Sequence, residues 1–123
     1  MRKTLSILLL TSLTACSSLS GIIVAPFDNN EYLLVDKIRT ESQIGKCDQA
    51  SIDGIYVESL ELKNYSQYLP KNAKSYEMTQ NLFTVVDELH QKQNPSAVYC
   101  SAKLNIISKS AEEIQQVMGN RPR

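Results

Sequence analysis

The stretch that decides the fold is NPSAVYCSAKLNIISKSAEEIQQVMG, residues 94–119. Apolar or small side chains recur there in steps of three and four residues, at Ala97, Cys100, Leu104, Ile107, Ala111, Ile114 and Met118. Such steps place side chains on one face of an α-helix. Asn94 suits the N-cap, Pro95 suits the first helical position, and Gly119 suits the position just after the helix end. The stretch therefore predicts an amphipathic helix.

Glycine and proline divide the preceding chain into segments of helical length. These helix breakers recur at nearly even intervals, at Gly45, Pro70, Pro95 and Gly119. Between them, helical periodicity predicts helices over residues 30–44, 48–69 and 72–93. Four amphipathic helices joined by short loops pack best as an up-down-up-down bundle. The sequence therefore predicts an all-α fold, a small four-helix up-down bundle.

Each of the three earlier segments has an apolar face. The first segment carries Tyr32, Val35 and Ile38, with Leu34 beside them. The second carries Ile52, Tyr56, Leu60, Tyr65 and Leu69. The third carries Tyr76, Thr79, Leu82, Phe83, Val86 and Leu89. A turn signal at Asp53-Gly54, followed by residues that favour a strand, leaves open a break of the second helix near Gly54.

Residues 1–15 have the layout of a secretory signal peptide. Two cationic residues precede the apolar run LSILLLTSL, which is too short for a transmembrane helix of ~20 residues. The run ends in Leu13-Thr14-Ala15-Cys16, which resembles the lipobox of bacterial lipoproteins, with threonine where alanine or serine is favoured. The resemblance implies cleavage before Cys16 and a diacylglycerol on the thiol of this cysteine. The alternative is an ordinary signal peptide followed by an incidental cysteine.

The resemblance to bacterial lipoproteins also implies a location. Ser17 and Ser18 follow the lipidated cysteine, with no aspartate at position 17, and the sorting rule of enteric lipoproteins then implies the outer membrane. Removal of residues 1–15 leaves 11 cationic and 13 acidic side chains, a formal net charge of −2. A nucleic-acid partner needs a basic face, so we expect none. The expected membrane contact is the lipid itself.

The sequence divides into four parts. We expect a signal peptide over residues 1–15, a lipidated tether over 16–29, a helical bundle over 30–119 and a tail over 120–123. Serine and glycine make the start of the tether flexible. Its apolar second half, Ile22 to Phe27, is expected to lie extended against the bundle; contact with lipid or a partner is the alternative.

Two cysteines remain after lipidation, Cys47 and Cys100. The up-down topology brings the first loop, which holds Cys47, to the same end as the start of the fourth helix, which holds Cys100. In an oxidising compartment this pair predicts a disulfide, whose loop of 54 residues implies a stabilisation of roughly 4 kcal/mol. A metal site or a redox pair is the alternative, although the cysteines form no C-x-x-C motif.

No catalytic constellation stands out. His90 is the only histidine, and its place near the end of the third predicted helix suits an interaction with the helix dipole. The chain has no glycine-rich phosphate loop and no G-x-S-x-G turn. Adjacent acidic residues are interpreted as solvated surface. The sequence therefore predicts a protein that is not an enzyme and has no cofactor and no metal.

Tyrosines cluster around the turn at residues 69–71. Tyr65, Tyr68 and Tyr76 lie there with three lysines nearby, a composition typical of recognition surfaces. The alternative is that these tyrosines cap the open end of the bundle, with their hydroxyls in water. Leu33 lies off the main apolar stripe of the first helix. We take these four residues as candidate partner-binding positions, in apolar rather than ionic contact.

These features predict an outer-membrane lipoprotein that binds another envelope protein. The layout of residues 1–119, with a lipobox, Cys47 after the first helix and Cys100 early in the fourth, is similar to that of the helical pilotins of type II secretion. Pilotins are small outer-membrane lipoproteins that carry a secretin subunit, so the resemblance implies a secretin as partner. The alternatives are a receptor-blocking exclusion lipoprotein, borne by a phage or plasmid, and a purely structural spacer.

Overall fold

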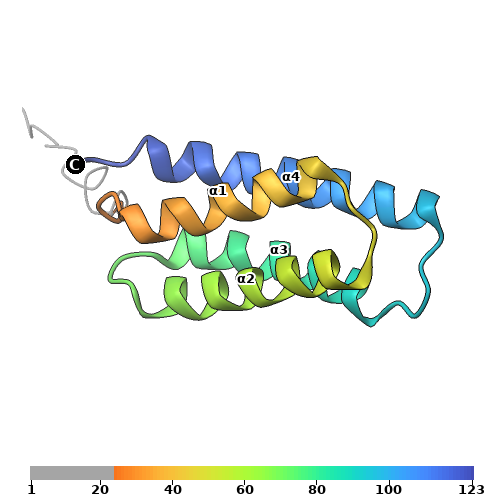
Figure 1. Ribbon diagram of the computed structural model, residues 1–123. Coiled ribbons are helices and arrows are strands. Elements are labelled where there is room, and N and C mark those ends of the chain that lie inside the picture. Colours follow the sequence, from red (N-terminus) through yellow and green to blue (C-terminus); the bar gives the residue numbers. More distant parts are fainter. Residues whose placement is uncertain (1–23) are drawn as a thin grey trace, which may run out of the picture.

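The computed structural model describes residues 24–123, and they form an antiparallel four-helix bundle. The helices are α1 (Asn29–Ile44), α2 (Gln49–Tyr68), α3 (Ala73–Gln91) and α4 (Ala97–Gly119). Each helix packs against two others, α1 against α2 and α4, and α3 against α2 and α4. Figure 1 shows the resulting up-down arrangement, with successive helices joined by short loops. The predicted bundle is confirmed.

The core lies between the four helices and is built from aliphatic side chains. Six of the seven positions of the predicted α4 stripe are buried, and only Ala97 at the start of the helix is exposed. Val35 and Ile38 of α1 are fully buried, as predicted. The α3 face is confirmed at Thr79, Leu82, Val86 and Leu89.

The buried face of α2 differs from the predicted face. The buried residues of this helix are Ile52, Ile55, Glu58, Ser59, Leu62 and Ser66. Tyr56, Leu60, Tyr65 and Leu69 are only half-buried, so the prediction was wrong in counting them as the core stripe. Serine can take core positions here because its hydroxyl finds a partner; Ser59, for example, donates to the Tyr56 carbonyl at 2.9 Å. The helix runs unbroken through Gly54.

The start of α4 also differs from the prediction. The N-cap is Ser96, whose hydroxyl accepts a hydrogen bond from the Tyr99 backbone N–H at 3.1 Å. Asn94 has a left-handed backbone with a φ of 48°, a conformation that asparagine tolerates better than most residues. Asn94 and Pro95 therefore belong to the α3–α4 loop, and α4 begins at Ala97.

Two glycines mark helix ends in different ways. Gly45 follows α1 with a φ of 73°, and its N–H donates to the Glu41 carbonyl, which is the expected role of glycine after a helix. Gly119 was predicted to follow α4, but it is the last residue of the helix. A Cβ there would lie 3.5 Å from the Tyr32 ring, which is ordinary van der Waals contact, so the packing of α1 on α4 leaves room for alanine at this position.

One end of the bundle, hereafter the tether end, holds Val24, the α2–α3 loop and the C-terminus (Figure 1). Ala25 is buried, and the Phe27 backbone N–H donates to the Pro122 carbonyl at 2.9 Å. The Arg123 guanidinium lies over the Phe27 ring, 4.9 Å from its centroid. The described part of the predicted tether therefore packs against the residues that follow α4.

A buried polar network, the Glu31–Arg121 network, joins α1, α2, α3 and the residues after α4 at the tether end. The Glu31 side chain is 0% exposed, and its carboxylate accepts from Arg121 Nη1 at 2.7 Å. It also accepts from the Ser66 hydroxyl and the Asn72 amide, each at 2.7 Å. Arg121 donates in addition to Asn72 Oδ1 and to the Ser75 hydroxyl. These bonds give partners to both buried charges, which burial without partners would penalise.

Candidate functional site

The opposite end of the bundle, hereafter the disulfide end, holds the α1–α2 and α3–α4 loops (Figure 1). Cys47 in the first loop is bonded to Cys100 in the first turn of α4, with 6.0 Å between their Cα atoms. Cys100 is fully buried, whereas Cys47 is exposed. The predicted disulfide is confirmed, and it fixes the α1–α2 loop against α4.

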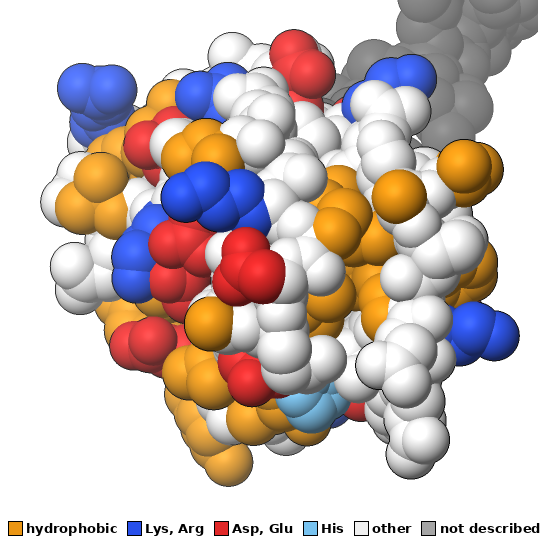
Figure 2. Space-filling view, turned by 45° about the vertical axis from the view of Figure 1, so that its right-hand side comes forward, with side chains coloured by type: hydrophobic (Ala, Val, Ile, Leu, Met, Phe, Trp, Pro, Cys, Tyr) orange, Lys and Arg blue, Asp and Glu red, His pale blue; other side chains and the backbone are white. Residues whose placement is uncertain are grey.

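A shallow groove of about 890 Å³ runs beside this disulfide. Its lining is formed by Gly45, Cys47, Ala97, Val98, Ser101, Ala102 and Asn105. Val98 is 81% exposed, and Ile44 at the end of α1 is 62% exposed. Figure 2 turns this end partly toward the viewer and shows hydrophobic side chains on its right-hand, left-hand and lower sides, with a charged cluster left of the centre. Small side chains and the exposed Val98 thus leave an apolar surface open to a partner, and Ile44 lies outside the lining of this groove.

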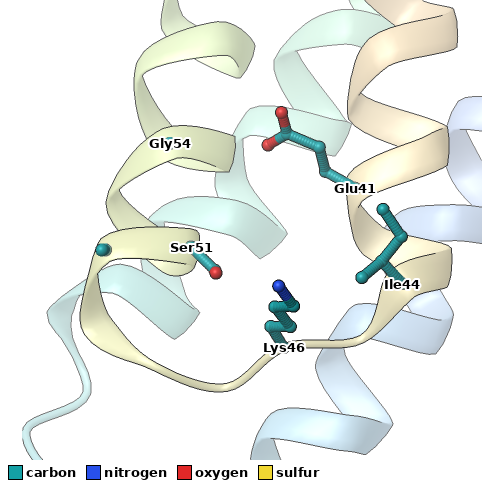
Figure 3. Close-up of a pocket in the computed structure, with 6 residues that line it drawn as sticks. Glu41, Ile44, Lys46, Ser51 and Gly54 are labelled. Atoms are coloured by element: carbon teal, nitrogen blue, oxygen red, sulfur yellow. The ribbon is translucent and has the colours of Figure 1, made fainter.

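A second hollow, of about 360 Å³, lies between the end of α1 and the start of α2. Figure 3 shows the Glu41 carboxylate reaching from α1 toward Gly54, with the Lys46 ammonium group pointing up from the loop. A Cβ at Gly54 would stand 3.6 Å from the Glu41 carboxylate, so a longer side chain would fill this space. The Ser51 hydroxyl at its rim already donates to the Asp48 N-cap carboxylate. The hollow offers one anion and one cation, which suits a polar group.

The Glu58 carboxylate lies on α2 beside this hollow and is almost buried, with the residue 6% exposed. Burial raises the pKa of the Glu58 carboxyl, and the neighbouring Glu41 carboxylate adds to the rise. The Lys37 ammonium group pairs with Glu58 and opposes the rise. The same pairing raises the pKa of Lys37. Ionised Glu58 thus depends on Lys37 for its stability.

We expect the stability of the domain to fall as the pH rises through the pKa that Glu58 has in the folded state. Because this pKa is raised, the folded chain holds the proton more tightly than the unfolded chain. The contribution of Glu58 to the free energy of unfolding is therefore greatest when the pH lies below the ordinary glutamate pKa, and it declines as the pH rises above that value. Glu58→Gln should flatten this decline, and Lys37→Ala should lower the free energy of unfolding at neutral pH, because ionised Glu58 then loses its cation. Urea denaturation across pH 4–8 measures both effects.

The matched control for these variants is Lys109→Ala, which removes an exposed lysine of α4. This change should alter the free energy of unfolding by less than Lys37→Ala does, because it leaves Glu58 paired. Equal pH slopes in Glu58→Gln and the parent chain would show that Glu58 has an ordinary pKa, which would contradict the prediction.

His90 links α3 to α2 near the disulfide end. Its Nε2 atom lies 3.2 Å from Asp53 Oδ1, and its ring stacks on Tyr56 with 3.9 Å between ring centroids. The Asp53 carboxylate also accepts from the Gln49 amide at 2.6 Å. These contacts fix the start of α2 against the end of α3.

The four predicted partner-binding residues divide into two kinds. Tyr68 and Leu33 are 82% and 54% exposed. Tyr65 is half-buried. Its hydroxyl donates to the Asp28 carboxylate at 3.1 Å and accepts from the side-chain amide of Asn30 in α1. Tyr76 is also half-buried, and its hydroxyl accepts from Gln80 at 3.1 Å. Tyr65 therefore helps to tie α2 to the start of α1, and only Tyr68 and Leu33 present most of their surface to solvent.

The predicted lipidation residue, Cys16, lies outside the described residues, as do Ile22 and Ile23. Across residues 24–123, the His, Cys, Asp and Glu side chains form no group of three or more that would hold a metal ion. None of the described helices is long and apolar enough to cross a membrane.

The groove beside the disulfide was not predicted from the sequence. Periodicity identifies the buried stripe of a helix, but it does not show which residues outside the stripe a neighbouring loop leaves uncovered. The sequence gives one indication that Val98 is exposed: it lies in the first turn of the predicted helix and outside the apolar stripe of that helix.

Comparison with known proteins gives no relative for this chain. No family model matches it, and no curated protein or solved structure is significantly similar to it.

Proposed function

We propose that this chain is a lipoprotein of the bacterial cell envelope, anchored by its lipid in the outer membrane. We propose further that it acts as a protein-binding module rather than as an enzyme. The single observation that carries the binding role is the groove beside the disulfide, with Val98 81% exposed at its rim. The anchor rests on the Leu13–Cys16 lipobox.

The arrangement of the two ends supports this function. Val24, the first described residue, lies at the tether end, whereas the groove lies at the disulfide end. The helix α4, with 23 residues, separates the two ends by about 35 Å. A chain anchored through Cys16 therefore presents its groove away from the membrane, where another envelope protein can reach it.

The chemistry of the groove favours an apolar segment as partner. Its lining holds Ala97, Ala102 and the disulfide, which allow close approach of a helix or strand, and Val98 offers an aliphatic contact. The formal net charge of −2 after removal of residues 1–15 gives weak long-range steering. Binding should therefore survive about half-molar salt, at which ionic contacts are screened within a few ångströms.

A photocrosslinking experiment tests the binding role. A benzoylphenylalanine side chain at position 98 should give one discrete crosslinked protein in intact envelopes, at low salt and at about half-molar salt. Val57 is the matched control, because it is also an exposed valine, 59% exposed, and lies on α2. Position 57 should give no such product. Equal products from both positions, or none from position 98, would contradict a specific groove.

The anchor is tested separately by Cys16→Ser. We expect this variant to remain as the uncleaved precursor and to take up no labelled palmitate, because lipid transfer to the cysteine precedes cleavage in lipoproteins. Cys47→Ser is the matched control and should be processed and labelled like the parent chain. Maturation of Cys16→Ser to the parent size would show that the lipobox prediction is wrong.

A pilotin-like role is the second candidate, and one observation favours it. The disulfide ties the loop after α1 to the first turn of α4, in a chain of four helices, which is the layout of the helical pilotins. In that role the crosslinked product from position 98 would be a secretin subunit. An exclusion role predicts instead a surface receptor or a conjugation protein as the product.

A further inference from the structure

We propose that the tether end is a docking surface for the headgroups of an anionic phospholipid bilayer, so that the bundle stands on the membrane rather than swinging freely above it. This inference rests on the proposed lipid anchor and adds to it a second contact with the membrane. The side chains that form the surface are Val24, Tyr68, Lys71, Lys74 and Arg123.

The side chains at this end are those that favour a membrane interface. Tyr68 is 82% exposed at the end of α2, and Val24 is 47% exposed where the tether meets the bundle. Tyrosine is enriched at membrane interfaces, where the ring contacts apolar chains and the hydroxyl stays in water.

The tether end carries a small excess of cations, whereas the domain as a whole is acidic. The formal net charge of residues 24–123 is −2, from 11 cationic and 13 acidic side chains. At the tether end, however, Lys71 and Arg123 are exposed cations, and Lys74, 4.0 Å from Glu77, is a third. Three acids lie at the same end: Glu31 is paired with Arg121 inside the bundle, Glu77 stands beside Lys74, and Asp28 accepts from Tyr65. With Arg121 counted, four cations face three acids, an excess of one positive charge. Cations beside an exposed tyrosine match the phosphate groups of anionic lipids.

The length of the tether determines which end can touch the membrane. Residues 16–23, between the predicted lipidated cysteine and Val24, span at most about 28 Å even when fully extended. The disulfide end is about 35 Å beyond the tether end along α4. The anchor therefore cannot bring the disulfide end to the bilayer by running along the bundle. The tether end, in contrast, is held next to the headgroups at high effective concentration.

The chain has no tryptophan, so a single introduced tryptophan reports its own surroundings. Lipidated Tyr68→Trp protein is reconstituted into vesicles of phosphatidylethanolamine and phosphatidylglycerol that contain brominated phospholipid. We expect the bromine to quench the indole fluorescence of this variant and the emission to shift to the blue. Val98→Trp, at an equally exposed position of the disulfide end, is the matched probe and should stay unquenched. Vesicles of phosphatidylcholine with the same share of brominated lipid should quench the Tyr68→Trp variant much less.

Neutralising the lysines tests the charge. In the Tyr68→Trp chain, Lys71→Gln with Lys74→Gln should lower the ratio of docked to undocked protein about 25-fold, since each lysine near an anionic surface contributes about fivefold. Lys46→Gln with Lys109→Gln removes the same charge from exposed positions outside the tether end, and should leave quenching unchanged.

The outcomes separate this inference from the anchor. A mature protein whose mass lacks the diacylglycerol overturns the proposed anchor and the docking together. A lipidated Tyr68→Trp protein that floats with the vesicles while its fluorescence stays unquenched overturns the docking alone. Equal quenching in neutral and anionic vesicles, or equal effects of the two lysine pairs, overturns the headgroup contact. A crosslink from position 68 to a protein, without quenching, would make that protein the occupant and overturn docking on lipid.

Discussion

Replacing Arg121 by alanine is expected to lower the free energy of unfolding by about 3–5 kcal/mol, because the change leaves the Glu31 carboxylate buried without its cation. Glu31 is 0% exposed and cannot recover the lost bond from water. The loss is a large share of the 5–15 kcal/mol by which domains are typically stable. We therefore expect a marked fall in the midpoint of urea denaturation, although the substitution lies beyond the last helix.

Urea denaturation of the purified chain measures this effect. Arg123→Ala is the control, because Arg123 is exposed over the Phe27 ring, and its loss should cost about 0.5–1 kcal/mol. The double variant Glu31→Leu with Arg121→Met removes both charges together and should recover part of the loss, because Ser66, Asn72 and Ser75 then lose hydrogen-bond partners. A loss for Arg121→Ala no greater than the loss for Arg123→Ala would show that the Glu31–Arg121 network adds little to stability.

Reduction of the Cys47–Cys100 disulfide is expected to lower the free energy of unfolding by about 4 kcal/mol. The bond closes a loop that contains α2 and α3, with a sequence separation of 53 residues, and so restricts the unfolded chain. Reduction also releases the α1–α2 loop from α4. The groove beside the bond should then lose its wall at Cys47 and Gly45, so crosslinking from position 98 should weaken even where the bundle remains folded.

Mass spectrometry of non-reduced peptides establishes the bond in protein taken from the envelope, and denaturation with and without dithiothreitol gives its energetic effect. Cys47→Ser is the preferred variant, because Cys47 is exposed whereas Cys100 is fully buried, and serine at position 100 would add a buried hydroxyl. Two free thiols in envelope protein, or equal stability with and without reductant, would contradict the prediction.

The fold was predictable because the strongest signals lie in residues whose only role is packing. Leu104, Ile107 and Ile114 repeat without interruption along α4, and their burial leaves few alternatives for that helix. The disulfide was predictable from the same pattern, because an up-down order of helices brings Cys47 and Cys100 to one end. The order of the helices alone was enough to predict this cysteine pair, without any knowledge of side-chain contacts.

The Glu31–Arg121 network was not predicted, and the reason is physical. Glu31, Val35 and Ile38 follow one another in steps of four and three, so the core stripe of α1 extends to a glutamate. Likewise Ser66 continues the stripe of α2 after Leu62. A charged residue in a core position signals a buried partner, but Arg121 follows the last helix, where periodicity gives no information. Tyr56 and Tyr65 were wrongly predicted to belong to the buried stripe of α2. Large rings can be half-buried at many positions around a helix, so a tyrosine does not mark the core face.

The position of the last residues has a practical consequence for work on this protein. Affinity tags and fluorescent reporters are commonly fused to the C-terminus, which here packs against Phe27 through Pro122 and Arg123. A reporter fused there would crowd the segment that leads to Cys16 and strain the position of Arg121. The α3–α4 loop is the better insertion point for measurements that do not need the groove, because this loop leads directly into Ala97 and Val98. Its residues 92–94 are exposed, and they lie at the far end of the bundle from the tether.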